Sequence, residues 1–217
     1  GAGTTQAEAL ASDLLTETCP IIGEAILQIA DPQVRNCGTV GGNVANGDPG
    51  NDLPAIMIAL GATYSMQGPG GTREVAASDF YEGIYATALA ADELLTGISI
   101  PTPPAGHGHA YKKMKRKVGD FATAATAVIL HMNGGACQTA SVTLTNAGET
   151  PVAVRSAADA LTGTPVDDAA IEAAAHFAID TADPASDMHG PAAFRKQMAG
   201  EMTRRAIRAA LASAQGG

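Results

Sequence analysis

Apolar residues recur along this chain with two different periods, and the change of period separates expected helices from expected strands. The opening segment carries Thr5-x-x-Glu8 ahead of leucines at helical spacing, which is the capping-box pattern of a helix start. A second apolar stretch, PIIGEAILQIA, begins at Pro20 and is expected to form a helix that Asp31 and the following proline end. The sequence thus predicts a pair of helices at the beginning of the chain.

The middle of the chain changes to shorter apolar runs that glycine and proline interrupt. Residues 52–60 are expected to form a short buried helix, and residues 62–68 a strand before a Pro-Gly-Gly turn. Residues 73–80 continue as a strand and then a loop, and residues 94–101 alternate partly, as a further strand does. This first half is therefore expected to be an α/β region.

The second half begins after the best boundary signal in the sequence. Residues 101–109 hold three prolines and two glycines without apolar periodicity, so we divide the chain into domains at residues 1–104 and 105–217. The histidines of this segment, His107 and His109, lack a third metal ligand nearby in sequence, and a solvated loop is the expected structure.

Residues 121–131 are apolar and β-compatible, and a partner stretch alternates after the Asn-Gly-Gly turn at Asn133. Two or three antiparallel strands are expected here. Helices are expected over residues 152–163, 167–182 and 191–213. In the last helix, Phe194 and later apolar residues at three- and four-residue steps predict a core-facing side, with Arg195 among the basic residues on the other sides.

Composition narrows the class of protein. The net charge of −9 argues against a nucleic-acid partner, because phosphate contacts need a basic face. No stretch approaches the ~18 consecutive apolar residues of a membrane span, and no leader pattern opens the chain, so a cytoplasmic protein is expected. The three cysteines have no metal-ligand spacing and are expected to be reduced, buried side chains.

The chemistry of the chain is concentrated in residues 35–60, RNCGTVGGNVANGDPGNDLPAIMIAL. Closely spaced glycines allow backbone N–H groups to approach a ligand, and a helix start adds positive charge, so an anion such as a phosphate is the expected ligand. The spacing fits neither GxxxxGK[ST] nor GxGxxG. Taken singly, Gly41 and Gly42 are also compatible with a tight turn, and Asp52 with an N-cap.

The whole string resembles the T-[IV]-G-G-[NS]…DP…D-[LYW]-P signature of the FAD-binding medium subunit of molybdenum hydroxylases. In that family, which includes carbon monoxide dehydrogenase and xanthine dehydrogenase, the glycine loop lies on the FAD pyrophosphate. The later aspartate contacts the polyol chain of the flavin. The resemblance thus implies these cofactor-binding residues: Thr39, Val40, Gly41, Gly42, Asn43, Asp48 and Asp52.

Two further segments carry the resemblance. The run that begins at Tyr111 is similar to the family element Y-x-K-x-x-R-x-x-x-D-[FI]-A, which implies a flavin-side role for Lys113, or for Lys112 in the alternative register. By itself such a charge run is usually a solvated face. Leu95 matches an apolar residue against the flavin or adenine, although a plain core leucine is the more frequent use.

The segment SDMHGPAAFRKQMAGEMTRRAIRAAL is similar to the C-terminal helices of the same family. His189 and Arg195 suggest a base with a cation, but the resemblance implies structural roles, with His189 as a local cap or turn contact. No catalytic side chain and no metal ligand is therefore predicted. The family's earlier subdomain, with its own glycine-rich FAD loop, has no counterpart in this sequence.

The resemblance implies an α+β protein: a PCMH-type FAD-binding subdomain, then a CO-dehydrogenase-flavoprotein C-terminal domain with a three-stranded antiparallel sheet plus helices. It implies FAD here, and molybdopterin and [2Fe–2S] clusters on a large molybdenum subunit and a small iron–sulfur subunit of a heterohexamer. FAD would pass electrons from the clusters to an external acceptor. The alternatives are an assembly scaffold that has lost FAD and, less well supported, a phosphate-handling hydrolase that would need a metal site.

Overall fold

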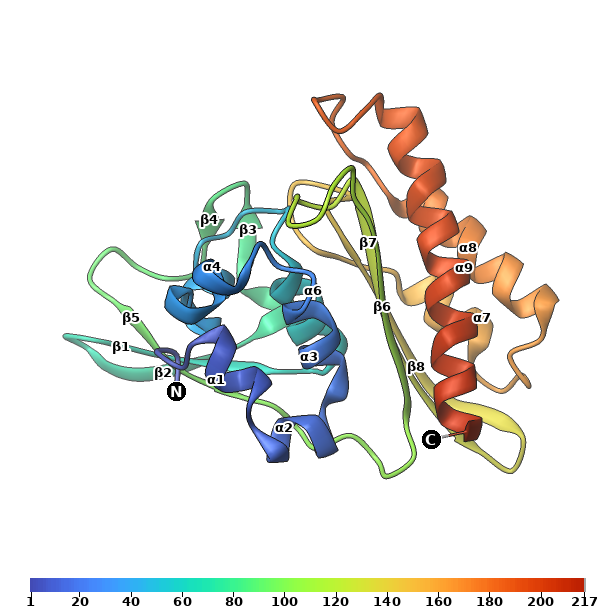
Figure 1. Ribbon diagram of the computed structural model, residues 1–217, viewed down its shortest axis with the longest axis horizontal. Coiled ribbons are helices and arrows are strands. Elements are labelled where there is room, and N and C mark those ends of the chain that lie inside the picture. Colours follow the sequence, from blue (N-terminus) through green and yellow to red (C-terminus); the bar gives the residue numbers. More distant parts are fainter. Residues whose placement is uncertain (217) are drawn as a thin grey trace.

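The computed structural model describes residues 1–216, and the chain folds into two parts that lie side by side (Figure 1). The helices of the first part are α1 (Gln6–Leu10), α2 (Asp13–Thr18), α3 (Pro20–Ile26), α4 (Pro32–Cys37), α5 (Val40–Ala45) and α6 (Asp52–Ala59). Its strands are β1 (Thr63–Gly68), β2 (Gly71–Ala76), β3 (Tyr81–Gly83), β4 (Ala86–Thr87) and β5 (Leu94–Ser99), with a 3-10 turn η1 (Ala77–Asp79).

The second part is a sheet followed by helices. Its strands are β6 (Gly108–Met114), β7 (Ala124–Asn133), β8 (Ala136–Thr145) and β9 (Val152–Ala153). Its helices are α7 (Arg155–Leu161), α8 (Asp168–Thr181) and α9 (Ala192–Gly216). The predicted α+β class is thus confirmed, and the three long strands are extended by the two-residue β9.

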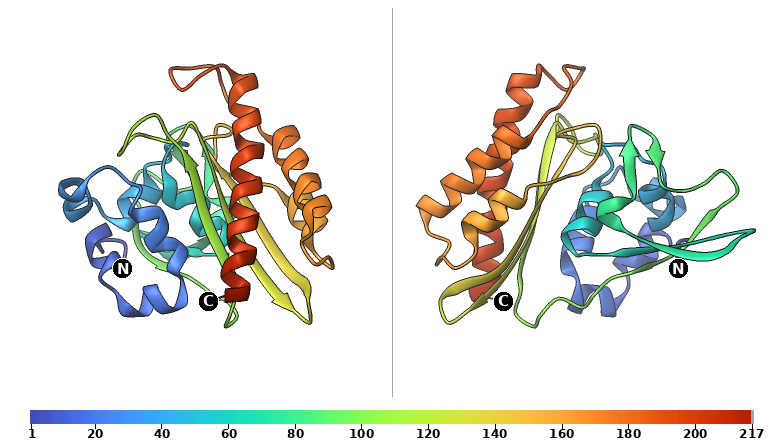
Figure 2. Two further views of the ribbon diagram at one scale, coloured as in Figure 1. Left: turned by 45° about the vertical axis from the view of Figure 1, so that its right-hand side comes forward. Right: turned by 180° about the vertical axis from the view of Figure 1, so that it is seen from behind.

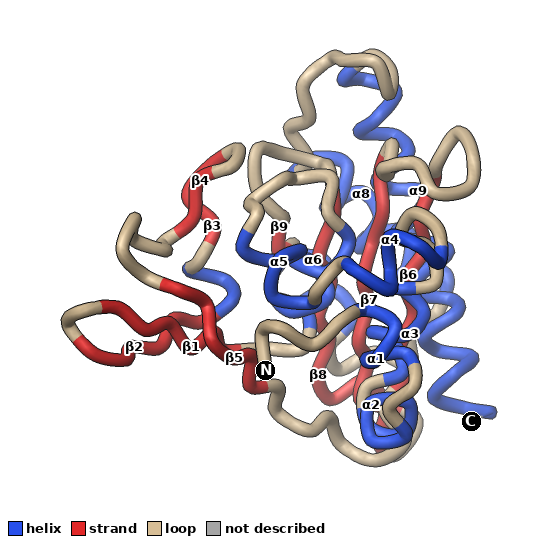
Figure 3. Tube along the Cα trace, turned by 60° about the vertical axis from the view of Figure 1, so that its left-hand side comes forward, coloured by secondary structure: helices blue, strands red, loops and turns tan. Residues whose placement is uncertain are grey.

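Both main sheets are antiparallel. The first has the order β2-β1-β5, and Figure 3 shows it on the side of the molecule away from α8 and α9. The second is a meander in the order β6-β7-β8-β9. The predicted hairpin between β7 and β8 is present, and Gly134 and Gly135 adopt φ values of 60° and 81° there, as its tight turn requires.

The second sheet is the central layer. Helices α7 and α9 pack on one of its faces, while α3 and α6 of the first part pack against β6, β7 and β8 (Figure 2). Gly108 lets α9 come very close, because a Cβ atom there would lie 2.1 Å from the carbonyl oxygen of Ala210. Alternate residues of β7 serve two cores, with Ala127 facing α6 and Val128 facing α9.

The structure divides the expected N-terminal helices more finely. Thr5 and Glu8 form the predicted capping box, but the helix ends at Leu10, and Ser12 caps a new one through the N–H of Leu15. The helix that begins at Pro20 already ends at Ile26, so the prediction that Asp31 ends it was wrong, and Asp31 has another role. Its carboxylate accepts the N–H of Val34 at 2.9 Å and so begins α4, because an N-cap satisfies N–H groups that a helix start leaves free.

Two predictions for α9 were wrong. Phe194 is 41% exposed, whereas Arg195, expected on the outer side, is 2% exposed. The helix begins at Ala192, and its first turn lies over the end of the sheet, where backbone carbonyls surround Arg195. Periodicity placed the apolar side correctly only farther along, at residues such as Met202 and Ile207.

Smaller expectations changed as well. Cys19 and Cys137 are buried free thiols, but Cys37 is exposed at the end of α4. His109 lies in β6 rather than in a solvated loop, with its ring near Glu24 and Ser213. Within residues 1–216, no helix combines the length and apolar content that crossing a membrane requires.

Candidate functional site

A pocket of about 420 Å³ opens where the glycine segment meets the second part of the chain. Its wall is built by α1, the turn from α4 into α5, the start of α6, strand β6 and residues 119–121. We call it the α5–β6 pocket. Of the predicted site residues, it brings together Thr39, Gly42, Asn43, Asp52 and Lys113. These residues come from both parts of the chain, so the pocket exists only after the parts have packed.

The glycine segment itself is helical, not an open loop. Thr39 caps α5 by accepting the N–H of Gly42 at 2.9 Å. The N–H groups of Val40 and Gly41 donate to the carbonyls of Thr4 and Ala2, at 2.8 and 2.9 Å. The predicted nest of free N–H groups is therefore not formed, because carbonyls of the N-terminal segment, residues 1–5, already accept their hydrogen bonds.

The two glycines of this helix, Gly41 and Gly42, have different roles. Gly41 is buried, and a Cβ atom there would lie 2.5 Å from Ala2, so glycine is needed for packing. Gly42 is exposed toward the α5–β6 pocket, where a Cβ atom would meet only Thr39 Oγ1, at 2.8 Å. Neither glycine has a positive φ. Both glycines let another group come close to the backbone of α5. At Gly41 this group is Ala2, and only at Gly42 can it be a ligand.

A buried ion pair forms the floor of the pocket. Lys113 Nζ donates to Asp52 Oδ2 at 2.7 Å, with side-chain exposures of 1% and 4%. Tyr111 Oη donates to Asp52 Oδ1 at 2.5 Å. Burial raises the pKa of Asp52, while the Lys113 ammonium and the Tyr111 hydroxyl oppose that rise. Loss of either partner would leave the other buried group without its ion-pair partner, which is strongly destabilising.

Amide groups make up another part of the wall. Asn51 Nδ2 donates to the carbonyl oxygen of Asn43 at 2.8 Å and to Asn46 Oδ1 at 3.0 Å. In contrast, Gln6 Oε1 and Asn43 Oδ1 are buried with no hydrogen-bond partner among residues 1–216. A buried acceptor without a donor is costly, so the wall suits a ligand that carries hydroxyl or N–H groups. The pocket therefore fits a flavin nucleotide, which has such groups on its polyol, ribose and rings.

Four predicted site residues are placed elsewhere. Gly41 is packed against Ala2, as above, and Val40 lines a small apolar pocket with Met57 and Ile98. Asp48 accepts the N–H of Gly50 and the hydroxyl of Tyr85, both at 2.8 Å. Leu95 is half-buried in β5 against the first core.

Sequence reasoning missed Gln6 as a pocket residue and Tyr111 as the buried hydrogen-bond partner of Asp52. Tyr111 stands at the head of the element that supplies Lys113, and the two lie on one face of β6 because strand residues alternate. That alternation was a usable signal. Gln6 has no comparable signal, since it follows a capping threonine in an ordinary helix start. Only the bridge between Thr5 and Thr39 brings it to the pocket.

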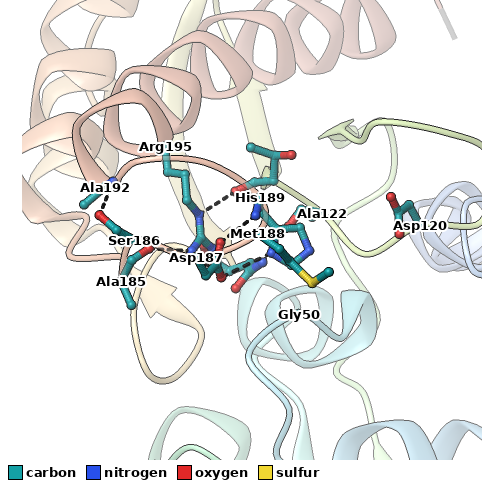
Figure 4. A network of polar contacts seen from close by, with 12 residues as sticks. Gly50, Asp120, Ala122, Ala185, Ser186, Asp187, Met188, His189, Ala192 and Arg195 are labelled. Carbon is teal, nitrogen blue, oxygen red and sulfur yellow. Dashed lines mark hydrogen bonds and ion pairs between the residues drawn. The ribbon is translucent and has the colours of Figure 1, made fainter.

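A second polar cluster lies at the start of α9 (Figure 4). The guanidinium of Arg195 donates to the carbonyls of Thr123, Ala185 and Asn146, at 3.2, 2.8 and 2.6 Å. It also donates to Asp187 Oδ2 at 2.9 Å. His189 contacts the same carboxylate through its N–H and Nδ1, which confirms the predicted local turn contact. We call this group the Arg195 cluster.

Two models of known protein families match this chain, one in each half. The family model described as FAD binding domain in molybdopterin dehydrogenase matches residues 1–103. The model described as CO dehydrogenase flavoprotein C-terminal domain matches residues 109–210. No part of this result supports the scaffold alternative, in which FAD binding has been lost.

The chain is 54% identical to the carbon monoxide dehydrogenase medium chain of Afipia carboxidovorans, over 99% of this chain and 75% of that one. It is 41% identical to the medium chain from Hydrogenophaga pseudoflava, over 98% and 74%. A solved structure described as reconstituted CO dehydrogenase from Oligotropha carboxidovorans matches with a TM-score of 0.96 and 54% identity, over 98% and 74%.

These matches agree with the sequence motif and with the fold. The resemblance inferred from the glycine segment is confirmed, as are FAD as the cofactor and an oxidoreductase as the type of enzyme. The chain belongs to the family of FAD-binding medium subunits of molybdenum hydroxylases, which includes carbon monoxide dehydrogenase.

Proposed function

We propose that this chain holds FAD in the α5–β6 pocket, as the relay between the iron–sulfur clusters of a partner subunit and an external electron acceptor. The single observation that carries the proposal is that residues of the family motif line a pocket in which a buried acceptor has no hydrogen-bond partner. Asn43 and Asp52, both from the motif, line the same pocket as Lys113, and Asn43 Oδ1 has no partner among residues 1–216.

Each residue has a defined task in this proposal. Thr39 fixes the first turn of α5, so that Gly42 can lie directly against the diphosphate of FAD. Asn43 and Asp52 accept hydrogen bonds from hydroxyl groups of the ligand. Phe121 is half-exposed in the wall and offers its ring to an aromatic group. Val40 and Gly41 support this wall as packed residues of α5, whereas Asp48 and Leu95 lie outside the pocket lining.

FAD supplies the redox chemistry when it is bound, and the protein supplies position and electrostatics. Lys113 is the cation of the pocket, but Asp52 neutralises it at 2.7 Å. We therefore infer that Lys113 acts mainly by fixing Asp52 and by joining β6 to α6. Its charge is too closely paired to act as an independent anion site.

We further propose that the partners are a large molybdenum subunit and a small iron–sulfur subunit, together forming a cytoplasmic heterohexamer. Carbon monoxide is the proposed substrate of the complex. Identity to two carbon monoxide dehydrogenase chains is 54% and 41%, whereas identity to a nicotine 6-hydroxylase subunit is 33%. The proposed domain boundary, residues 1–104 and 105–217, is supported by family models that match on either side of it.

The test of the pocket is Gly42→Val, with flavin content and FAD affinity measured in the intact enzyme. The added side chain crowds Thr39 Oγ1 at the wall of the pocket, so we expect flavin occupancy to fall at least tenfold and the disturbed cap to cost about 1 kcal/mol of stability. Gly70→Val is the matched control, because a Cβ atom at Gly70 meets nothing within 4 Å and lies in the β1–β2 turn. Full occupancy in Gly42→Val would place the diphosphate elsewhere.

A further inference from the structure

Gln6 is a buried polar residue to which the family motif gives no role. Its side chain lines the α5–β6 pocket, and the residue is only 3% exposed. Its Oε1 atom has no hydrogen-bond partner within residues 1–216. Leaving a buried amide oxygen without a donor costs free energy, and native proteins generally avoid it.

The backbone holds this amide in place. The N–H of Gln6 donates to the carbonyl oxygen of Gly38 at 2.8 Å, next to the bridge between Thr5 and Thr39. A Cβ atom at Gly38 would lie 3.4 Å from Gln6 Nε2 and 3.0 Å from the carbonyl oxygen of Val34. The amide of Gln6 thus lies within van der Waals reach of Gly38, next to the backbone hydrogen bond that joins the two residues.

A neighbouring side-chain amide shows that the protein itself can supply hydrogen-bond partners in this wall. Asn51, in the same wall, donates to two oxygens of the protein. In the described part of the chain, the buried side-chain atoms without partners are Gln6 Oε1, Asn43 Oδ1, His107 Nε2 and Thr143 Oγ1. The first two belong to residues that line one pocket, and Asn43 belongs to the family motif. Gln6 resembles Asn43 in having a buried amide oxygen without a hydrogen-bond donor.

We propose that Gln6 is a further FAD-binding residue, whose amide pairs with a hydroxyl or ring-edge group of the cofactor and not with its diphosphate. This inference rests on the proposed place of FAD in the α5–β6 pocket. A side-chain amide oxygen needs a hydrogen-bond donor, and a diphosphate at neutral pH offers only acceptors. Hydroxyl groups and nucleobase or flavin ring edges carry donors and acceptors together.

The test is Gln6→Met in the intact enzyme, from which FAD is removed and titrated back. Methionine has nearly the same length but no amide, so the FAD dissociation constant is expected to rise about five- to thirty-fold. The thermal midpoint of the flavin-free enzyme should stay the same or rise, because an unsatisfied buried group has been removed. Gln67→Met, on the exposed side of β1, is the matched control and should change neither quantity.

Ligand fragments locate the contact. Riboflavin, ADP and inorganic pyrophosphate are bound separately to the wild-type and Gln6→Met enzymes. A loss of affinity with riboflavin assigns the contact to the flavin or its polyol, and a loss with ADP assigns it to the adenosine. An equal loss with inorganic pyrophosphate would overturn the proposal, since it would place Gln6 at the diphosphate.

Other outcomes separate this inference from the pocket assignment. Unchanged FAD affinity in Gln6→Met, while Gly42→Val loses FAD, would leave the pocket in place and remove Gln6 from it. A lower thermal midpoint without FAD and an unchanged affinity would make Gln6 a structural residue. Full FAD occupancy in Gly42→Val would overturn the pocket assignment and the Gln6 contact that rests on it.

Discussion

The floor of the α5–β6 pocket and the Arg195 cluster use the same chemistry, a cation buried against a carboxylate, but the protein completes them to different degrees. Arg195 donates to three backbone carbonyls and to Asp187, so its guanidinium is surrounded by acceptors from the chain itself. The pocket joins the Asp52–Lys113 pair to a wall in which Gln6 Oε1 and Asn43 Oδ1 have no donor within residues 1–216.

The difference separates an architectural cluster from a binding one. A buried charge is stable only when its hydrogen bonds are made, and the Arg195 cluster meets that condition without a ligand. It ties α9 to the ends of β7 and β8 and to residues 183–190 (Figure 4). The pocket wall instead keeps two buried acceptors without donors among residues 1–216, as expected if it is the proposed FAD site. Burial alone would not have distinguished the two clusters.

The largest effect is expected from breaking the complete cluster. Arg195→Met leaves Asp187 its contacts with His189 but removes the donor of the buried Thr123 and Asn146 carbonyls. It should reduce the free energy of unfolding by about 3–5 kcal/mol, because each of these buried carbonyls then lacks its side-chain hydrogen bond. Urea unfolding measures this loss. Lys196→Met, which removes an exposed cation 3.7 Å from Asp183, should change stability little. A stable Arg195→Met protein that has lost only its flavin would reverse the architectural assignment.

A smaller effect on stability, with a larger one on flavin, is expected from the pocket pair. Lys113→Met should cost about 2–3 kcal/mol of stability, because Asp52 then remains buried with only Tyr111 as a partner. The double variant Asp52→Asn, Lys113→Met should recover much of that stability, since no lone charge remains.

In the double variant, stability and FAD affinity are expected to respond differently. Its FAD affinity should stay at least tenfold below that of the wild type, because the ligand has lost the Asp52 carboxylate. Flavin titration next to urea unfolding checks this. Recovery of both quantities would mean that the pair is architectural, like the Arg195 cluster.

The smallest effect concerns pH. Burial alone would raise the pKa of Asp187, but the N–H and ring of His189 and the charge of Arg195 outweigh it and lower the pKa from its ordinary value of 3.8. A lowered pKa in the folded state gives stability that is present above pH 3.8 and is lost as the pH falls below it. Asp187→Asn should therefore flatten the acid limb of a pH–stability curve, and an unchanged limb would contradict the shift.

The local elements and the cofactor were predictable because their signals are local. Thr5 and Glu8 form the capping box, Asn133 and its glycines form the hairpin turn, and α8 and α9 follow their apolar spacing. The motif from Thr39 to Asp52 identified the FAD family. Predictions of which side chains are buried were less accurate, because burial depends on tertiary packing, as the exposed Phe194 and the buried Arg195 show.

The sequence by itself thus determined most of the helices and strands, their order and the ligand class, although it predicted an open loop where α5 forms. The tertiary structure alone decided which groups remain available to that ligand. Packing of residues 1–5 occupies the N–H groups of Val40 and Gly41, and packing of β6 on α6 brings Lys113 to Asp52, 61 positions away in sequence. The physical reason is that a hydrogen bond depends on what lies within about 3 Å of an atom, and long-range packing sets that distance.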